Sequence, residues 1–313
     1  MEAGSAEGVR AVRVAVVGLG AIGAAYAERL VAAGVDVEVV VPAERVARYR
    51  NTRTSVNGTP CGFALVTPEE AAPADVLLVA VKHPQLTEAI EAATPVVTPA
   101  TVVLSLLNGI SSEEDLAAAF PEATVLLALA VGIDAQRAGR EVRYSSLGRI
   151  VFGEPANTPP HTPAVRRVAA LFDLAGIPYE VPVDMVRSLW WKFLVNVGVN
   201  QVSAVLRAPY GAFQADGSPA RRVMLAAQRE VIAVANARGI DLGEDDLRRW
   251  LTVLDGLHPA GYSSMAQDTI AGRETEVGIF GGAIVALGAA AGIPVPVNAT
   301  LAGLLEALAP RAS

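Results

Sequence analysis

The sequence has little cysteine, little histidine and no excess of positive charge, and each shortage excludes a class of protein. Its single cysteine, Cys61, cannot form an internal disulfide, which indicates a reducing, cytoplasmic environment. The 25 lysines and arginines are outnumbered by 32 aspartates and glutamates, and this net charge of −7 argues against a general nucleic-acid binder. The three histidines, His83, His161 and His258, have no metal-ligand spacing, so we expect no metal site.

The sequence also has no long apolar run, and we expect no secretion signal at its first residues. Glycine, proline and charged residues interrupt the apolar stretches before they reach about 20 residues, so we expect no membrane span. Residues 1–10 carry no basic segment followed by an apolar core, and we expect a frayed leader there. With 313 residues, 52% of them apolar, the chain is long enough for two domains with large cores.

A glycine motif close to the N-terminus predicts a dinucleotide site. Residues 12–18 have the pattern of a short buried strand, and Gly18, Gly20 and Gly23 follow as G-x-G-x-x-G at the start of an apolar-periodic helix. A second strand, residues 35–41, completes the strand–helix–strand unit in which this motif binds a pyrophosphate at the helix N-terminus. The predicted cofactor loop consists of Gly18, Leu19, Gly20, Ala21, Ile22 and Gly23.

The end of the second strand leaves the choice of coenzyme open. NAD sites usually have Asp or Glu there, bound to the ribose 2′-hydroxyl, but Val41 and Pro42 occupy this place. Glu44 comes slightly late in the sequence. Arg45 and Arg48 either face a 2′-phosphate or are solvated charges on a surface helix. We therefore expect NADPH, with NADH as the alternative.

Three more buried strands predict a parallel, doubly wound sheet. They cover residues 74–82, 101–109 and 123–133, and helical segments separate them. Lys82 and Asn108 stand at the ends of the first two strands. Because ligands bind outside the carboxyl ends of strands in such sheets, both residues are candidates for the site.

The second half of the chain is predicted to be helical. Residues 140–154 have the pattern of a β-hairpin that closes the first domain, and from about residue 183 the patterns are helical. The predicted fold class is α/β, with an N-terminal Rossmann-type doubly wound parallel sheet over residues 1–182 and a C-terminal all-helical domain over residues 183–313.

One long apolar helix carries a row of polar side chains. Residues 191–200, WKFLVNVGVN, are apolar except for Lys192, Asn196 and Asn200, which recur every four residues and so share one side of a helix. A lone lysine on such a helix can extend its ammonium group to the surface. Three aligned polar residues instead indicate a polar cleft, where substrates commonly bind.

Six segments resemble the ketopantoate reductase family (2-dehydropantoate 2-reductases). They are GLGAIG, VAVKHPQ, SLLNGI, LWWKFLVNVGVN, RAPYG and SSMAQDTIAGRETEV, in order along nearly the whole chain. The resemblance implies hydride transfer from NADPH to the 2-keto group of 2-dehydropantoate, giving pantoate in pantothenate synthesis. The same chemistry on another 2-keto acid, as in a relative similar to D-2-hydroxyacid dehydrogenases, is the alternative. A non-catalytic nucleotide-binding sensor ranks third.

The resemblance implies that Lys192 is the general acid that protonates the nascent alkoxide. Glu276 would position this lysine and contact the cofactor, and Ser264 would hold the substrate carboxylate. Taken alone, Ser264 also suits a helix N-cap and Glu276 a helix start. Twelve residues separate Ser264 from Glu276, so one straight helix would not bring them to one side, and Gly272 allows the necessary break.

The remaining implied roles fall on two amides of the long helix and on two strand ends. Asn196 and Asn200 would bind the hydroxyl or carbonyl of the substrate. Lys82 would lie beside the cofactor and help hold the resting lysine. Asn108 would orient both the nicotinamide ribose and the substrate.

Two positions depart from the family pattern. Pro42 stands where many members carry an arginine that holds the 2′-phosphate, and Gly261 replaces a polar residue of some ketopantoate reductases. The first leaves the coenzyme open, and the second leaves the exact acid open. An Ala/Gly-rich stretch at residues 281–292 indicates close helix packing, and an apolar helical domain suits a homodimer.

Overall fold

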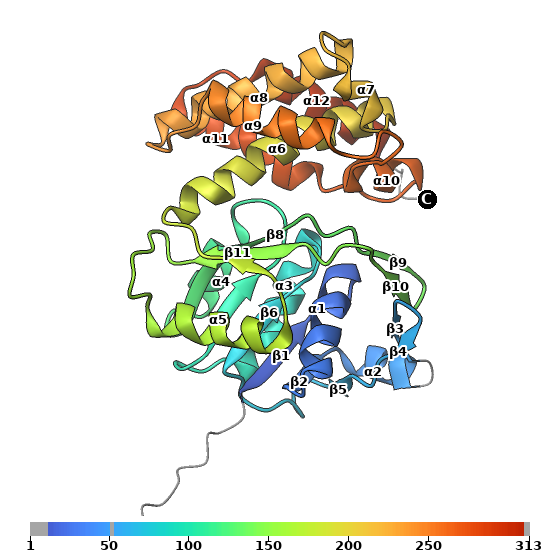
Figure 1. The fold of residues 1–313 in the computed structure, drawn as a ribbon, viewed down its shortest axis with the longest axis vertical. Helices are drawn as coiled ribbons and strands as arrows, with labels where there is room; N and C mark the ends of the chain where they lie inside the picture. The colour runs from blue at the N-terminus through green and yellow to red at the C-terminus, as the bar shows by residue number, and fades with distance from the viewer. Residues whose placement is uncertain (1–11, 51–52, 310–313) are drawn as a thin grey trace, which may run out of the picture. The chain divides into compact units, whose positions relative to one another are not determined.

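The structure, a computed structural model, describes residues 12–50 and 53–309 (Figure 1). The chain divides into two compact units. The first comprises Met1–Leu107 and Ser112–Met185, and the second comprises Asn108–Ser111 and Val186–Ser313. The frayed leader expected at residues 1–10 lies outside the described residues. In the described part of the chain, every helix is too short or too polar to cross a bilayer.

An eight-stranded sheet forms the centre of the first unit, in the order β12-β11-β8-β7-β6-β1-β2-β5. Its parallel strands are β1 (Arg13–Val17), β2 (Asp36–Val40), β5 (Ala64–Val66), β6 (Val76–Val79), β7 (Val102–Ser105) and β8 (Thr124–Val131). β1 pairs with β2 on one side and with β6 on the other, so the strand order reverses beside β1. The predicted Rossmann-type fold is therefore confirmed.

Alternate residues of β1 point into two different cores, as the two-residue repeat of a strand requires. Val14 and Val16 join a buried cluster with α1 (Ala21–Ala32) and α5 (Pro163–Ala175). Ala15 and Val17 join a second cluster with α3 (Leu86–Ala93) and α4 (Ser112–Ala119). Helices thus cover both sides of the sheet, which explains why its central strands are continuous apolar runs.

A smaller sheet also belongs to the first unit, in the order β4-β3-β10-β9. Its strands are β3 (Ser55–Val56), β4 (Thr59–Pro60), β9 (Gln136–Ala138) and β10 (Glu141–Arg143). β9 and β10 form an antiparallel hairpin, and Gly139 between them has a φ of +60°. A left-handed residue in a tight turn favours glycine.

The predicted hairpin over residues 140–154 is wrong, because its two halves belong to different sheets. β10 stays in the small sheet, whereas β11 (Arg149–Gly153) pairs antiparallel with β8 and in parallel with β12 (Tyr179–Glu180). Gly148 allows the chain to pass close to β8. Its φ is +63°, and a Cβ at this residue would lie 2.2 Å from the carbonyl oxygen of Val131.

The second unit is helical, as predicted. Its helices are α6 (Met185–Leu206), α7 (Gly211–Gln214), α8 (Pro219–Ala237), α9 (Glu244–Asp255), α10 (Ser264–Ile270), the π-helix η3 (Gly278–Gly282), α11 (Ala283–Ala291) and α12 (Pro296–Leu308). α6 is the central helix. Its Leu194 and Val197 join one buried cluster, and its Val199 and Val202 join another.

The Ala/Gly-rich stretch at residues 281–292 packs closely, as its composition predicts. A Cβ at Gly281 would lie 2.3 Å from Oε1 of Gln201, and one at Gly288 would lie 2.8 Å from the carbonyl oxygen of Ile293. Side chains are therefore excluded at both positions by neighbours that are themselves buried or part of the backbone.

Candidate functional site

The glycine loop connects β1 to α1, and its three glycines have different reasons to be glycine. Gly18 has a φ of +102°, and a Cβ there would lie 2.5 Å from the carbonyl oxygen of Ala80. A Cβ at Gly23 would lie 1.9 Å from the carbonyl oxygen of Gly18. Gly20 is exposed, and the nearest atom to its Cβ position is 3.7 Å away. Two glycines are thus needed for packing, and the third leaves an open surface.

This loop fits the pyrophosphate of a dinucleotide. Gly20 is the N-cap of α1, and no side chain caps the helix there. The N–H groups of Ala21, Ile22 and Gly23 begin the helix, where they have no carbonyl partner within it and where the helix dipole is positive. Leu19 is held from the small sheet, because Nη1 of Arg137 donates to its carbonyl oxygen.

A pocket opens beside the glycine loop, at the carboxyl ends of β1, β2 and β6. The adenosine of a dinucleotide belongs outside these strand ends. The pocket is lined by Val17, Gly18, Leu19, Val40, Val41, Pro42, Arg45, Tyr49, Val81, Gln85, Glu88, Ala89 and Ala92.

Some of the residues that follow β2 line this pocket, and others do not. Val41 and Pro42 line it, as does Arg45 from α2 (Ala43–Arg50), whereas Glu44 is exposed and does not belong to the lining. The side chain of Arg48 lies outside the described residues. Lys82 follows β6 in the same unit and is exposed, and its backbone N–H donates to Oε1 of Gln85 at 3.3 Å.

In the second unit, the structure places Lys192, Asn196 and Asn200 on a single helix, α6. Because they recur every four residues, their side chains leave the helix on one side. Lys192 and Asn196 are half-buried, and Asn200 is 5% exposed. The row predicted from the sequence is therefore present in the fold.

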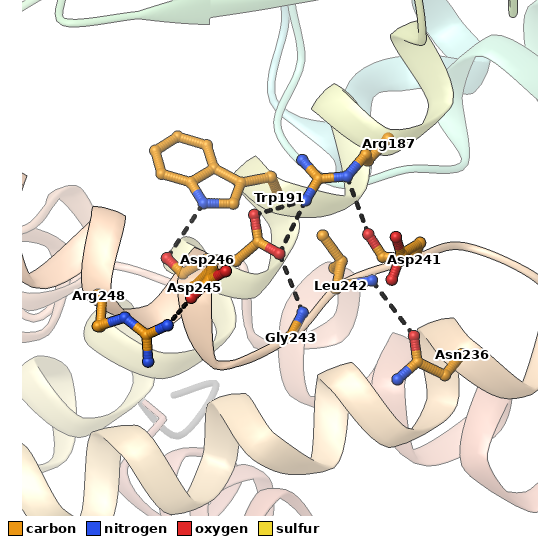
Figure 2. Close-up of polar contacts among 9 residues, drawn as sticks. All are labelled: Arg187, Trp191, Asn236, Asp241, Leu242, Gly243, Asp245, Asp246 and Arg248. Atoms are coloured by element: carbon orange, nitrogen blue, oxygen red, sulfur yellow. Dashed lines mark hydrogen bonds and ion pairs between the residues drawn. The ribbon is translucent and has the colours of Figure 1, made fainter.

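A polar clamp fixes another side of α6 (Figure 2). Nη2 of Arg187 donates to both carboxylate oxygens of Asp246, at 2.8 and 2.9 Å, and its Nε donates to the carbonyl oxygen of Asp241 at 2.9 Å. Asp246 also accepts the N–H of Gly243 at 2.9 Å, while the indole of Trp191 donates to the Asp246 carbonyl at 3.4 Å. These contacts attach α6, the helix that carries Lys192, to the start of α9.

Asn108 and Glu276 meet within the second unit. Nδ2 of Asn108 donates to Oε2 of Glu276 at 3.1 Å. The next residue, Gly109, has a φ of +95°, and its Cβ position is 3.4 Å from Cβ of Ile279 in the π-helix. The carbonyl of Glu276 accepts the N–H of Ile279 at 3.2 Å, and Glu276 stands two residues before the π-helix. π-turns occur frequently at functional sites.

The N-cap of α10 is Ser263, so helix capping does not explain the neighbouring Ser264. Oγ of Ser263 accepts the N–H of Ala266 at 3.2 Å and pairs with Oγ of Ser203 at 3.0 Å, and Ser263 is buried. Ser264 is the first residue of α10 and is exposed. After this helix, Gly272 has a φ of +64°, which provides the break expected between Ser264 and Glu276.

The structure also explains two other positions noted in the sequence, Gly261 and Cys61. A Cβ at Gly261 would lie 3.0 Å from the carbonyl oxygen of His258 and 3.1 Å from the ring of Tyr210, so close packing explains the glycine. Cys61 is half-buried, and burial raises the pKa of its thiol. A raised pKa keeps it protonated near neutral pH, which disfavours a nucleophilic role.

Three contacts could not be predicted from local sequence patterns. In the first unit they are Arg137 with Leu19 and Arg45 with Glu88, and in the second unit Asn108 with Glu276. Each joins segments that lie far apart in the chain. Periodicity assigns residues to helices and strands, but it carries no information about which distant side chains pair. The polar residue types at strand and helix ends, and for Asn108 and Glu276 the family resemblance, indicated the individual residues but not their pairing.

Comparisons with known proteins cover almost the whole chain. The family model described as "Ketopantoate reductase PanE/ApbA" matches residues 14–157, and "Ketopantoate reductase PanE/ApbA C terminal" matches residues 184–309. A 2-dehydropantoate 2-reductase of Caulobacter vibrioides is 31% identical over 302 residues, which is 95% of this chain and 99% of the relative.

Solved structures agree with this result. A 2-dehydropantoate 2-reductase from Geobacter metallireducens GS-15 has a TM-score of 0.82 and 29% identity, covering 95% of this chain and 99% of that one. A D-mandelate dehydrogenase solved with NADH and anilino(oxo)acetate has a TM-score of 0.85 at 21% identity, covering 95% and 98%, and shares the fold.

Proposed function

The chain belongs to the ketopantoate reductase family, and we propose that it reduces 2-dehydropantoate to pantoate with a nicotinamide coenzyme. The observation that carries the proposal is the division of parts between the two units. The first holds a glycine loop that fits a pyrophosphate, and the second holds Lys192, Asn196 and Asn200 on one side of α6. A non-catalytic nucleotide sensor would have no need for this row.

The coenzyme supplies the hydride that reduces the 2-keto carbon. The glycine loop would hold its pyrophosphate through backbone N–H groups at the start of α1. We assign NADPH as the coenzyme and NADH as the alternative, since Arg45 lines the pocket where a 2′-phosphate would lie and no acid stands at Val41 or Pro42. The residues assigned to coenzyme binding are Gly18, Leu19, Gly20, Ala21, Ile22, Gly23, Lys82, Asn108 and Glu276.

Lys192 is assigned as the general acid. Reduction of a ketone builds negative charge on the keto oxygen, and an ammonium group both stabilises that charge and delivers the proton from its Nζ. Glu276 would orient this ammonium. The bond from Asn108 holds one oxygen of the Glu276 carboxylate at 3.1 Å, which restricts the directions in which the carboxylate can point.

The substrate would be held by amide and hydroxyl groups. Asn196 and Asn200 each offer an amide NH2 group as donor and a carbonyl oxygen as acceptor, which suits the keto oxygen and the hydroxyl of 2-dehydropantoate. Ser264 is assigned to the substrate carboxylate, because Ser263 performs the capping that would otherwise explain a serine at this place. Another 2-keto acid would use the same groups.

The test is turnover of 2-dehydropantoate and a panel of other 2-keto acids, followed through the absorbance of NADPH and NADH. We expect turnover of 2-dehydropantoate to exceed that of the rest. Lys192→Ala should lower kcat by about 10²–10⁴ while coenzyme affinity stays unchanged. Turnover confined to a different 2-keto acid would replace the substrate and keep the mechanism. Coenzyme binding without turnover of any acid would favour the sensor.

The proposal includes a homodimer. An apolar groove on the second unit is lined by Val202, Leu206, Val223 and Leu304, among others, and the last three of these are 53%, 40% and 46% exposed. Exposed apolar patches commonly mark protein interfaces. Light scattering of the purified protein would give the mass of the particle in solution, and a monomer would contradict this part.

A further inference from the structure

The pocket beside the glycine loop has one charged side chain of each sign on its wall. Among the described residues that line it, only Arg45 from α2 and Glu88 from α3 are charged. Nη2 of Arg45 lies 3.9 Å from Oε1 of Glu88, and the two side chains are 47% and 52% exposed. We propose that Glu88 counteracts Arg45 and so lowers the preference for a coenzyme with a 2′-phosphate, an inference that rests on the proposed function.

The position of the pair follows from the fold. In a doubly wound sheet the adenosine ribose lies beyond the end of the second strand, where an acid binds its hydroxyls or an arginine binds its phosphate. Here β2 ends at Val40, and Val41 and Pro42 bring no charge to this place. Charges that act on the ribose can come from the neighbouring helices. Among the side chains that the structure describes, Arg45 and Glu88 are the charged ones that line the pocket.

The two coenzymes differ at this point by a dianion. A 2′-phosphate would be attracted by the guanidinium of Arg45 and repelled by the carboxylate of Glu88. A ribose 2′-hydroxyl would instead donate a hydrogen bond to that carboxylate. One residue, Glu88, therefore disfavours NADPH and favours NADH.

The ion pair itself is weak enough to be exchanged. Exposed pairs of this kind contribute little to stability, so Arg45 can leave Glu88 for a phosphate with little loss. Two other cations near the pocket are less able to move. Arg137 and Arg140 lie 5.8 and 5.4 Å from the ring centre of Tyr49, and Arg137 is also bonded to the carbonyl oxygens of Leu19 and Gly139.

The test compares Glu88→Gln with Glu91→Gln. Glu91 lies on the same helix, α3, is exposed, and does not line the pocket, so its variant makes the same change in net charge away from the ribose. Affinities for NADPH, NADH, 2′,5′-ADP and 5′-AMP are measured by calorimetry without any keto acid. We expect Glu88→Gln to raise the NADPH-to-NADH affinity ratio about three- to tenfold, and the 2′,5′-ADP-to-5′-AMP ratio equally.

The control variant, Glu91→Gln, shows whether the effect is specific to Glu88. Glu91→Gln should leave both ratios unchanged, and an equal change in the two variants, or no change in Glu88→Gln, would overturn the proposal. Both glutamates are exposed, so neither variant should unfold the protein, and a thermal melt verifies this. Because no keto acid is present, a failed reductase assay would refute the proposed function and leave the coenzyme ratio still informative.

A double-mutant cycle with Arg45→Gln separates the two partners. Arg45→Gln alone should weaken NADPH about tenfold and leave NADH nearly unchanged. In that background, Glu88→Gln should have a smaller effect on NADPH than in the wild type, because part of its effect is release of the guanidinium. An undiminished effect would overturn the coupling between Glu88 and Arg45.

Discussion

Asn108 and Glu276 stand 168 positions apart in the sequence, and a hydrogen bond of 3.1 Å joins the amide of one to the carboxylate of the other. Asn108 arrives from the chain that leaves β7, and Glu276 arrives from the loop before the π-helix. Coenzyme contact is assigned to both residues, and the orientation of Lys192 is assigned to Glu276. It is the most direct place to test how the second unit prepares the proposed acid.

Asn108→Ala should lower kcat about tenfold, since a hydrogen bond to a charged group contributes about 1.5–3 kcal/mol when its geometry is intact. Asn108→Asp should lower it further, because two carboxylates would then face each other. Steady-state kinetics measure both effects, with thermal unfolding as the control for stability. An unchanged kcat in both variants would show that the bond has no part in catalysis.

The glycine loop separates a packing role from a binding role. Gly23→Ala should destabilise the first unit strongly, because its Cβ would lie 1.9 Å from the carbonyl oxygen of Gly18. A Cβ has room at position 20, so the Gly20→Ala variant should unfold at nearly the wild-type temperature. It should bind coenzyme more weakly, because the added methyl group would obstruct the pyrophosphate. Calorimetric melting and coenzyme titration compare them. Unimpaired binding by Gly20→Ala would argue that the pyrophosphate lies elsewhere.

The Arg187–Asp246 clamp predicts a difference between two adjacent acids (Figure 2). Asp246 has a side chain only 6% exposed, so Asp246→Ala should lower the free energy of unfolding by about 2–4 kcal/mol, through the lost ion pair and the lost helix cap. Asp245 pairs with Arg248 on the surface and is 86% exposed. Asp245→Ala should change the free energy of unfolding by less than about 1 kcal/mol. Urea unfolding measures both, and similar values would contradict the clamp.

The sequence pattern was most informative where burial dictates it. Continuous apolar runs located β1, β6 and β7, because helices cover both sides of the parallel sheet. The four-residue spacing of Lys192, Asn196 and Asn200 correctly placed them together, since one helix carries all three and no tertiary contact is needed to align them.

The sequence pattern failed to predict which strands pair and at which residue a helix begins. Strand character at residues 140–154 was correct for both halves, but alternation cannot tell which strand each half pairs with. Ser263 and Ser264 have the same capping propensity, and only the helix start selects Ser263. The Arg45–Glu88 pair joins two helices, so no local pattern announces it.

The grouping of Asn108–Ser111 with Val186–Ser313 has a consequence for dissecting or recombining this protein. The polypeptide passes from one unit to the other at residues 107–108, 111–112 and 185–186. A single cut after residue 185 would therefore leave Glu276 without its amide partner, and a chimera built at that junction would combine Asn108 of one parent with Glu276 of the other. An exchange of the helical unit between relatives keeps Asn108 and Glu276 from the same parent only when residues 108–111 are transferred with it.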